Sequence, residues 1–342
     1  MIKITFKNVG QGDSIILEWN HNNQNKIAII DCNITSNKQN PVLDYLQSSE
    51  YREIEFVLLT HPHYDHYSGM NALLDFCEKK NIIIKKFLHT SQQNPEYLQA
   101  AVLSNLAIKE LSSLFRKIKH LWKFKNLIEY QCYVSDSNSD LILTDDIKLK
   151  FLAPSVVEFD NYISNVPTFS DEEDANNKAN ANWLSTVIKI YSEDWWILLT
   201  SDCEKRVLKR LGIKSKEEFS GEILLGQCPH HGALGSHYNA FWKLRQQNNK
   251  TQVKTPIVFS VGNNIYNHPS EEVIRSFNKN SYKIFSTNKV GYLLSFKSEQ
   301  LVNETIALLN TSSELVSENI QNSDMAGDKV FLINEGKIQL PS

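Results

Sequence analysis

Residues 53–69 read EIEFVLLTHPHYDHYSG, and this stretch decides both the fold and the site. The apolar run that ends at Thr60 predicts a buried strand, and His61, His63, Asp65 and His66 follow it directly. Removing three imidazoles and a carboxylate from water at the end of a strand is costly unless they bind a cation or take part in catalysis. Imidazole and carboxylate together suit Zn²⁺, Mn²⁺ or Fe²⁺.

The spacing of these four side chains can accommodate two neighbouring ions. His61 and His63 lie two residues apart in an extended turn and can point the same way. Asp65 and His66 follow as the chain enters a helix near Gly69, so they approach from another side. We therefore expect the rest of the chain to supply a bridging carboxylate and further imidazoles.

Length and composition predict a globular protein without a general preference for polyanions. The 342 residues are 41% hydrophobic and 22% charged, enough for a large core in one domain or two. A formal net charge of −3 means that a polyanion would need a local basic patch. Five scattered cysteines without a C-x-x-C pair argue against disulfides. Neither a signal peptide nor a run of about eighteen apolar residues is evident, so we expect a cytoplasmic protein without a membrane partner.

Short strands alternate with helices along the rest of the chain, which predicts an α/β (α+β) protein with antiparallel or mixed sheets. The expected strands are residues 2–6 and the segments SIILEW, KIAIID, FVLLT, IIIKKFLHT, DIKLKFLAP, EILLGQ and TPIVFSVG, together with the hairpins STVIKIYSEDWWILLTSD and KVFLINEGKIQL. Helices are expected at 41–48, 71–80, within 95–125, at 204–211, at 270–280 with Ser270 as its cap, and at 299–309. The acidic, Asn-rich segment 167–181 is predicted to be a loop.

Polar residues that can bind metal recur where predicted strands end. Asp31, Asp202, His268 and the pair His230 and His231 all follow apolar runs. In a layered α/β fold, a site is assembled from loops at strand ends. A single aspartate there usually caps a helix or makes a turn, and a single buried histidine usually belongs to the core. The recurrence, together with the dense cluster after Thr60, favours a metal site.

These residues together resemble the metallo-β-lactamase fold superfamily, whose H-x-H-x-D-H motif stands here at 61–66. The resemblance narrows to the hydrolase domain of ComEC-type DNA-uptake proteins and their soluble relatives. Five motifs carry it: VGQGDS at 9–14, IIDCN at 29–33, LLTSDCE at 198–204, PHHGALGS at 229–236 and SVGNNIYNHP at 260–269. It covers residues 1–296 as one hydrolase domain, with gaps at a helical insert (95–135) and the acidic loop (167–181). Residues 297–342 are expected to be a C-terminal extension that packs on the domain or binds a protein partner.

The resemblance implies a four-layer αββα sandwich with two divalent ions at one edge of its sheets. Zn²⁺ is the first choice, with Mn²⁺ or Fe²⁺ as alternatives. The implied ligands are His61 and His63 for one ion, Asp65 and His66 for the second, Asp202 as the bridge, and His230 and His231 as the remaining imidazoles, without a decision on which of the last two binds which ion. Ser201 stands where the family usually has glycine.

Further roles follow from the same resemblance. Asp31 would orient a histidine ligand through a hydrogen bond. A separate ligand histidine in mid-chain has only His89 and His120 as candidates, and neither lies in a recognisable motif, so we favour the pair at 230–231 for that role. Asp65 is expected to be catalytic as well as a ligand. His268 and Asn263 are candidates for protonating a leaving group or stabilising charge, with His237 a weaker one; the alternative for His268 is a turn residue before a proline.

The substrate is less constrained by the sequence than the chemistry. Two adjacent ions suit hydrolysis of phosphodiesters, and also of esters, lactones and thioesters. Arg116, Lys117, Lys119 and Lys123 on the helix at 109–125 could follow a phosphate backbone, or could be an ordinary solvated face. Our first hypothesis is a phosphodiesterase or nuclease acting on DNA, RNA or nucleotides. The alternatives are a hydrolase of small esters, lactones or thioesters, and a metal-stabilised interaction module in a multi-protein bacterial system such as phage defence.

Overall fold

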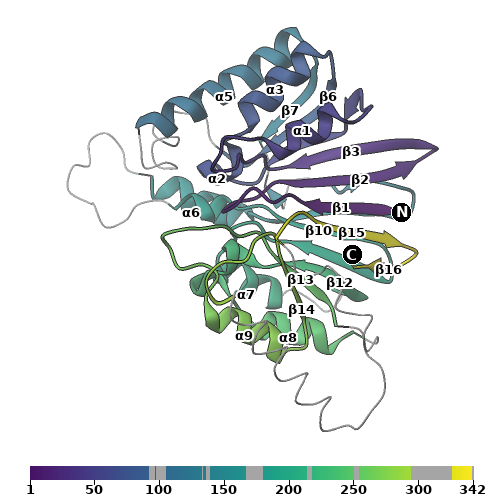
Figure 1. Cartoon of the computed structure of the whole chain (residues 1–342), viewed down its shortest axis with the longest axis vertical. Coiled ribbons are helices and arrows are strands. Elements are labelled where there is room, and N and C mark those ends of the chain that lie inside the picture. The colour runs from purple at the N-terminus through teal and green to yellow at the C-terminus, as the bar shows by residue number, and fades with distance from the viewer. Residues whose placement is uncertain are drawn as a thin grey trace.

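A computed structural model describes residues 1–91, 97, 105–132, 134–135, 139–166, 180–213, 218–249, 254–293 and 326–340. Two mixed β-sheets lie face to face between outer layers of helices (Figure 1). This arrangement confirms the predicted four-layer αββα sandwich. None of the helices in the described ranges combines the length and the apolar character needed to cross a membrane.

The first sheet is built from both ends of the chain. Its strands, in spatial order, are β16 (Lys337–Gln339), β15 (Lys329–Asn334), β1 (Ile2–Phe6), β2 (Ile15–His21), β3 (Gln24–Ile30), β5 (Phe56–Leu59), β6 (Ile83–His89) and β4 (Glu53–Ile54), with β7 (Leu127–Cys132) also paired to β6. Pairing is antiparallel from β16 to β3 and parallel from β3 to β7. Strands β2 and β3 meet in a tight turn at Asn22 and Asn23, both of which have positive φ.

The second sheet contains strands from the middle of the chain. Its order is β14 (Lys283–Ser286), β13 (Pro256–Phe259), β12 (Glu222–Gln227), β11 (Trp195–Leu199), β10 (Val187–Tyr191), β9 (Lys148–Ala153) and β8 (Leu141–Ile142). The strands from β8 to β11 are antiparallel, and those from β11 to β14 are parallel. The predicted hairpin of β10 and β11 is confirmed, and both tryptophans of β11 are buried.

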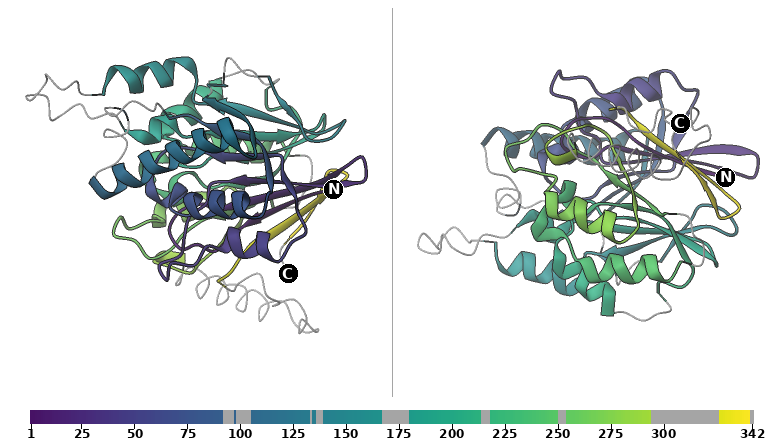
Figure 2. Two further views of the ribbon diagram at one scale, coloured as in Figure 1. Left: turned by 90° about the horizontal axis from the view of Figure 1, so that it is seen from above. Right: turned by 60° about the horizontal axis from the view of Figure 1, so that its bottom comes forward.

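Helices cover the outer face of each sheet. Those over the first are α1 (Pro41–Gln47), α3 (Met70–Lys79) and α5 (Asn105–Phe124); those over the second are α7 (Lys205–Ile213), α8 (Asn239–Gln247) and α9 (Glu271–Lys279) (Figure 2). Other helical segments are α2 (Tyr64–Tyr67), α6 (Val156–Ser164), η2 (Ala181–Leu184), η3 (Pro229–Gly232) and η4 (Leu234–Ser236). Ser270 is the N-cap residue of α9, as predicted, but its side chain makes no capping hydrogen bond.

In the described residues, the core has three large layers of apolar side chains, one between the sheets and one under each helical layer, and a small fourth cluster around Tyr162 and Leu184. Part of the predicted C-terminal extension joins the central layer: β15 pairs with β1, and Phe331 lies edge to face with both Phe6 and Phe285. The predictions for residues 167–179, for the first part of the insert and for a helix at 299–309 lie outside the described residues.

Candidate metal centre

The predicted ligands converge where the two sheets present the carboxyl ends of their parallel strands. Asp31 directly follows β3, and the segment from Thr60 to His66 follows its parallel neighbour β5. On the facing sheet, Asp202 follows β11, and His230 and His231 follow its parallel neighbour β12. Parallel strands bring their carboxyl ends to one edge of a sheet, so four loops meet there.

The glycine turn of the VGQGDS motif packs against the loop after β5 and holds that loop in place. Gly12 has a φ of +118°, and a Cβ at this position would lie 2.2 Å from the carbonyl oxygen of Asp65. This close approach lets the Asp13 amide donate a hydrogen bond to that carbonyl at 3.2 Å. The Cys32 amide donates to the carbonyl of His66 at 2.9 Å. Backbone contacts thus fix the helix α2 that carries Asp65 and His66.

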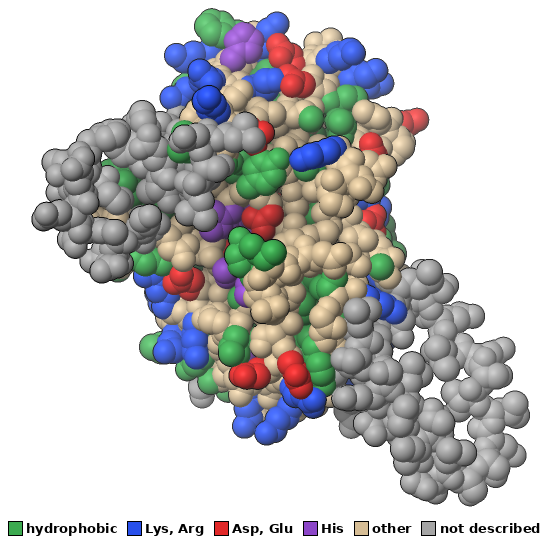
Figure 3. Space-filling view, turned by 60° about the vertical axis from the view of Figure 1, so that its left-hand side comes forward, with side chains coloured by type: hydrophobic (Ala, Val, Ile, Leu, Met, Phe, Trp, Pro, Cys, Tyr) green, Lys and Arg blue, Asp and Glu red, His purple; other side chains and the backbone are tan. Residues whose placement is uncertain are grey.

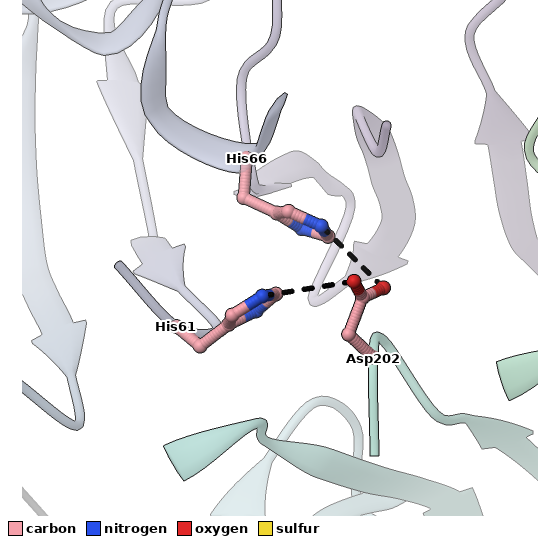
Figure 4. Close-up of side chains that lie close together, drawn as sticks. All are labelled: His61, His66 and Asp202. Carbon is pink, nitrogen blue, oxygen red and sulfur yellow. Dashed lines mark ion pairs between the residues drawn. The ribbon is translucent and has the colours of Figure 1, made fainter. Parts of the chain in front are cut away.

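Asp202 lies at the centre of the cluster and faces a different pair of imidazoles with each oxygen. Its Oδ2 is 3.8 Å from Nε2 of His61 and 3.4 Å from Nε2 of His230. Its Oδ1 is 3.5 Å from Nε2 of His66 and 3.2 Å from Nε2 of His231. Figure 4 shows His61 and His66 pointing at opposite oxygens of the one carboxylate. Asp202 therefore has the geometry of a bridging residue.

His63 and Asp65 complete two groups of side chains on either side of Asp202. Nδ1 of His63 is 3.0 Å from Nε2 of His61. The Asp65 carboxylate lies on the other side, 3.5 Å from Nε2 of His231 and 3.9 Å from Nε2 of His66. One group contains His61, His63 and His230; the other contains Asp65, His66 and His231. The structure thus places the two adjacent histidines, His230 and His231, against different oxygens of Asp202.

The backbone at 230–231 explains why adjacent histidines serve different groups. His230 and His231 have φ values of 49° and 53°, in the left-handed region that residues other than glycine rarely adopt. Their rings are 6.1 Å apart and inclined by 71°. A left-handed residue costs roughly 1–2 kcal/mol, and such strain is concentrated at functional sites. Here it turns two successive imidazoles toward opposite oxygens of Asp202.

Buried atoms without hydrogen bonds show that the cluster fits a metal. Nε2 of His66, Nε2 of His231 and Oδ1 of Asp202 are inaccessible to water and have no hydrogen-bond partner. Buried polar atoms are nearly always paired, so three orphaned atoms facing one another need a ligand. Imidazole nitrogen and carboxylate oxygen are the donor set that borderline divalent ions prefer.

The electrostatics of the cluster lead to the same conclusion. Although burial opposes it, the carboxylates of Asp202, Asp31 and Asp65 raise the pKa of His66 well above its ordinary value. Burial also acts to lower the pKa of His231, but the carboxylates of Asp202 and Asp65 outweigh this effect and raise the pKa to about 9. In the metal-free protein, protons on these imidazoles therefore supply the positive charge that the buried carboxylates require.

Hydrogen bonds behind the cluster orient the rings. Nδ1 of His66 lies 2.7 Å from Oδ2 of Asp31, which also accepts a hydrogen bond from the Thr60 hydroxyl. Burial raises the pKa of Asp31 to about 6, against the lowering effect of His66. Nδ1 of His231 is 2.7 Å from the carbonyl oxygen of Ser260. In both rings Nδ1 is engaged behind the site and Nε2 faces the cluster, as in metal-binding histidines.

Two residues of the site have no role in the sequence-based prediction. One carboxylate oxygen of Asp13 lies within 4.8 Å of Asp202 and His231 ligand atoms, and Oδ1 of Asp13 is buried without a hydrogen bond. Gln227 donates to Oδ2 of Asp13 at 2.8 Å and accepts from the amides of Thr200 and Ser201, at 2.9 and 3.0 Å. Gln227 thus joins the loops of both sheets beside Asp202. In the sequence, Asp13 stands only as one position of the VGQGDS motif.

A cavity of about 970 Å³ opens over the cluster. Its walls include Tyr64, Asn263 and His268, and the half-buried His268 ring lies 5.4 Å from the His230 ring. Burial and the imidazoles of His230 and His231 lower the pKa of His268 to about 4. Histidine and acidic side chains meet at the centre of this face, with apolar side chains on either side (Figure 3).

Three other histidines considered in the sequence lie away from this cavity. His237 is buried and hydrogen-bonds the Ser276 hydroxyl at 2.8 Å, on the second sheet's helical layer. His89 is buried among aromatic rings, and His120 is exposed beside Glu78. None of the three lines the cavity or belongs to a group of ligand atoms in the described residues.

The basic residues of α5 begin beside the cavity and continue away from it. Ala107 and Glu110, in the first turns of this helix, line the cavity. Arg116, Lys119 and Lys123 follow on the exposed side, whereas Lys117 is paired with Asp75.

Comparison with known proteins bears on the family of the chain. Residues 8–145 match a family model described as the metallo-beta-lactamase superfamily. The chain is 22% identical over 298 residues to ComE operon protein 3 of Bacillus subtilis (strain 168), which covers 83% of this chain and 31% of the relative. The chain thus spans about a third of the length of that relative.

Solved structures similar to this one have low sequence identity. The metallo-beta-lactamase fold protein YhfI from Bacillus subtilis is 11% identical with a TM-score of 0.42, over 84% of this chain and 95% of that chain. Zn(2+)-bound PqqB from Methylobacterium extorquens is 9% identical with a TM-score of 0.43, over 84% of this chain and 98% of that chain.

Proposed function

The chain belongs to the metallo-beta-lactamase superfamily, and from that premise we propose that it is a dinuclear metal-dependent hydrolase of phosphodiester bonds in nucleic acids or nucleotides. The observation that carries this proposal is the pair of ligand groups that share Asp202, with orphaned buried atoms facing one another. His61, His63 and His230 would hold one ion, and Asp65, His66 and His231 the other. Zn²⁺ is the first choice, with Mn²⁺ or Fe²⁺ as alternatives.

Two adjacent ions, when bound, lower the pKa of a shared water toward ~7 and stabilise both the attacking and the leaving oxygen of a displacement. The chain's own residues have separate tasks. Asp202 would fix the spacing of the two positions, and Asp65 would orient the water as well as bind. Asn263 and His268 line the cavity beyond the cluster, where each can hydrogen-bond the leaving oxygen.

Two observations support a phosphodiester as the substrate. The sequence is related to ComE operon protein 3, and five sequence motifs resemble the hydrolase domain of DNA-uptake proteins. In addition, the exposed Arg116, Lys119 and Lys123 continue along α5 from the cavity wall, where a phosphate backbone could follow them. A protein partner at residues 297–342 stays a proposal.

The test is a metal-defined assay of the purified protein on DNA, RNA and bis(p-nitrophenyl) phosphate, beside Asp65→Ala. We expect hydrolysis with Zn²⁺ or Mn²⁺, two ions per chain, and loss of both turnover and one ion in the variant. Inactivity of the wild type on all three substrates with either metal, at full occupancy, would refute the phosphodiesterase proposal.

The exposed apolar side chains of Ile265 and Tyr266 at the cavity rim favour a second candidate, a hydrolase of small esters, lactones or thioesters. Under that candidate, p-nitrophenyl acetate would be cleaved faster than the phosphodiesters, and α5 would be irrelevant to turnover. A protein that binds two ions and cleaves none of these substrates would instead fit the interaction module.

A further inference from the structure

A second, smaller cavity of about 460 Å³ adjoins the one above the metal cluster. The two cavities share Asn180, Asn182, His230 and His268 as lining residues. The His230 ring separates them: its Nε2 is 3.4 Å from Oδ2 of Asp202, and its Nδ1 is 3.1 Å from the hydroxyl of Ser236 in the smaller cavity. A group bound beside Ser236 would lie across the His230 ring from Asp202.

Basic side chains at the start of α7 form one wall of this cavity. Lys205 is exposed and Arg206 is partly buried, and both line it together with Glu204. The Arg206 guanidinium lies 4.2 Å from the centre of the Trp183 ring, which fixes its plane. Nε and Nη2 of Arg206 are nevertheless buried without a hydrogen bond.

The neighbouring carboxylate does not satisfy those donors. Oε2 of Glu204 is 3.3 Å from Nε of Arg206, an ion pair without the geometry of a hydrogen bond. Oε1 of Glu204 accepts hydrogen bonds from Asn180 and from the Trp183 indole, each at 3.2 Å. Unmade hydrogen bonds of a buried charged group are costly, and the Arg206 side chain is partly exposed. A turn of this side chain toward a phosphate in the cavity would let the guanidinium fork, which matches phosphate oxygens, make those bonds.

We propose that this cavity is a subsite for a second phosphate group of the substrate, next to the phosphodiester at the metal cluster, with Arg206 and Lys205 as its contacts. This inference rests on the proposed phosphodiesterase function. It narrows the substrate from any phosphodiester to a molecule that carries at least two phosphates, such as an oligonucleotide strand. A diester with one phosphate would reach the cluster but leave the subsite empty.

The test compares substrates with one and with two phosphates. Bis(p-nitrophenyl) phosphate has one, and a trinucleotide has two phosphodiesters. For Arg206→Gln we expect kcat/KM on the trinucleotide to fall about 10–100-fold, as for loss of a charge-assisted hydrogen bond, and on bis(p-nitrophenyl) phosphate to stay within about twofold. Lys209→Gln is the matched control, because Lys209 is exposed on the same helix and lines neither cavity. It should leave both values unchanged.

Equal effects of Arg206→Gln on both substrates, or no effect on either, would overturn the subsite. Thermal unfolding checks that Arg206→Gln is folded. If it is not, Lys205→Gln is used in its place, because Lys205 is exposed. If the wild type cleaves no phosphodiester, the proposed function fails, but the subsite remains testable by binding. In chelator, the trinucleotide should bind the wild type and Lys209→Gln alike and Arg206→Gln more weakly, whereas equal binding by all three proteins refutes the subsite. Inorganic phosphate should compete with the trinucleotide for the subsite, and Arg206→Gln should weaken this competition. If the variant does not weaken it, free phosphate binds elsewhere, and this result would also count against the subsite.

Discussion

His66 and His89 are both completely buried near the ends of adjacent parallel strands of the first sheet, yet their surroundings are opposite in character. Each has a buried Nε2 without a hydrogen bond. Nε2 of His66 faces Oδ1 of Asp202 at 3.5 Å, whereas His89 stacks on the Tyr130 ring at 4.9 Å and contacts Phe115 edge to face. An unpaired imidazole nitrogen alone therefore does not identify a metal site, and the facing carboxylates do.

The difference is also visible in the two pKa values. Carboxylates raise the pKa of His66 well above its ordinary value against the effect of burial. Burial without a carboxylate lowers the pKa of His89 to about 3. His66 is thus held in a place that demands positive charge, and His89 in one that excludes it.

The largest effect is expected from Asp202→Asn, which removes the charge shared by both ligand groups. Each oxygen of Asp202 faces imidazoles of a different ligand group. We therefore expect metal affinity to fall at least ~100-fold, a larger loss than for a residue that lies behind the ligands, and turnover to fall to background. Metal content after dialysis and the phosphodiester assay measure this. His89→Phe is the control and should keep two ions. Retention of two ions by Asp202→Asn would contradict the bridging assignment.

The next effect concerns stability in acid. The folded pKa of His89, about 3, lies below the ordinary value of 6.5, so the unfolded chain binds the proton first as pH falls. His89 therefore contributes stability above pH ~6.5 that is lost progressively down to about pH 3, by up to ~1.4 kcal/mol per pH unit. Denaturant unfolding of the metal-free wild type and His89→Phe between pH 8 and pH 4 isolates this share. As pH falls, the unfolding free energy of the wild type should decrease relative to that of His89→Phe. A difference between the two proteins that does not change with pH would refute the lowered pKa of His89.

A smaller change is expected from Asp13→Asn, which tests a carboxylate that does not itself line the large cavity. Asp13 lies beside Asp202 and His231, so its charge should stabilise a cation held there. We expect metal affinity to fall about 10–100-fold, the usual effect of residues behind metal ligands. Asp44→Asn, an exposed position on α1 with the same loss of charge, should leave affinity unchanged. Equal affinities of Asp13→Asn and wild type would exclude this role.

The predictable part of the site is the part that is contiguous in sequence. The segment from His61 to His66 contains four metal-competent side chains in six positions, and its strand and short helix follow from local patterns. The αββα architecture was predictable from the resemblance, and the strand pairing across β1 and β15 was not. That pairing joins residues more than 300 positions apart, which no local pattern encodes.

The remaining features depend on backbone conformation and on contacts between loops. The division of His230 and His231 between two groups follows from two successive left-handed residues. The position of Asp13 follows from its hydrogen bond with Gln227, which is distant in sequence. A lone aspartate after glycine is usually a turn residue, so its sequence context alone could not reveal this placement.

The smallest effect is expected on the helix that also buries His89. The inner side of α5 places Phe115 against the His89 ring, and its outer side carries Lys119 and Lys123. If this side follows a phosphate backbone, Lys119→Glu with Lys123→Glu should weaken binding of a long DNA or RNA strand several-fold and reduce its dependence on salt. Hydrolysis of bis(p-nitrophenyl) phosphate should not change, because that diester is too short to reach beyond the cavity.

A matched variant separates the position of these charges from their number. Lys243→Glu with Lys279→Glu reverses two exposed charges on α8 and α9, over the other sheet. Equal weakening by both double variants would mean that only net charge matters, since long-range attraction depends on total charge at low salt. Weakening by the α5 variant alone, measured at several salt concentrations, would place the strand on α5. Unchanged binding by both would leave α5 as an ordinary amphipathic helix whose function is to enclose the aromatic core around His89.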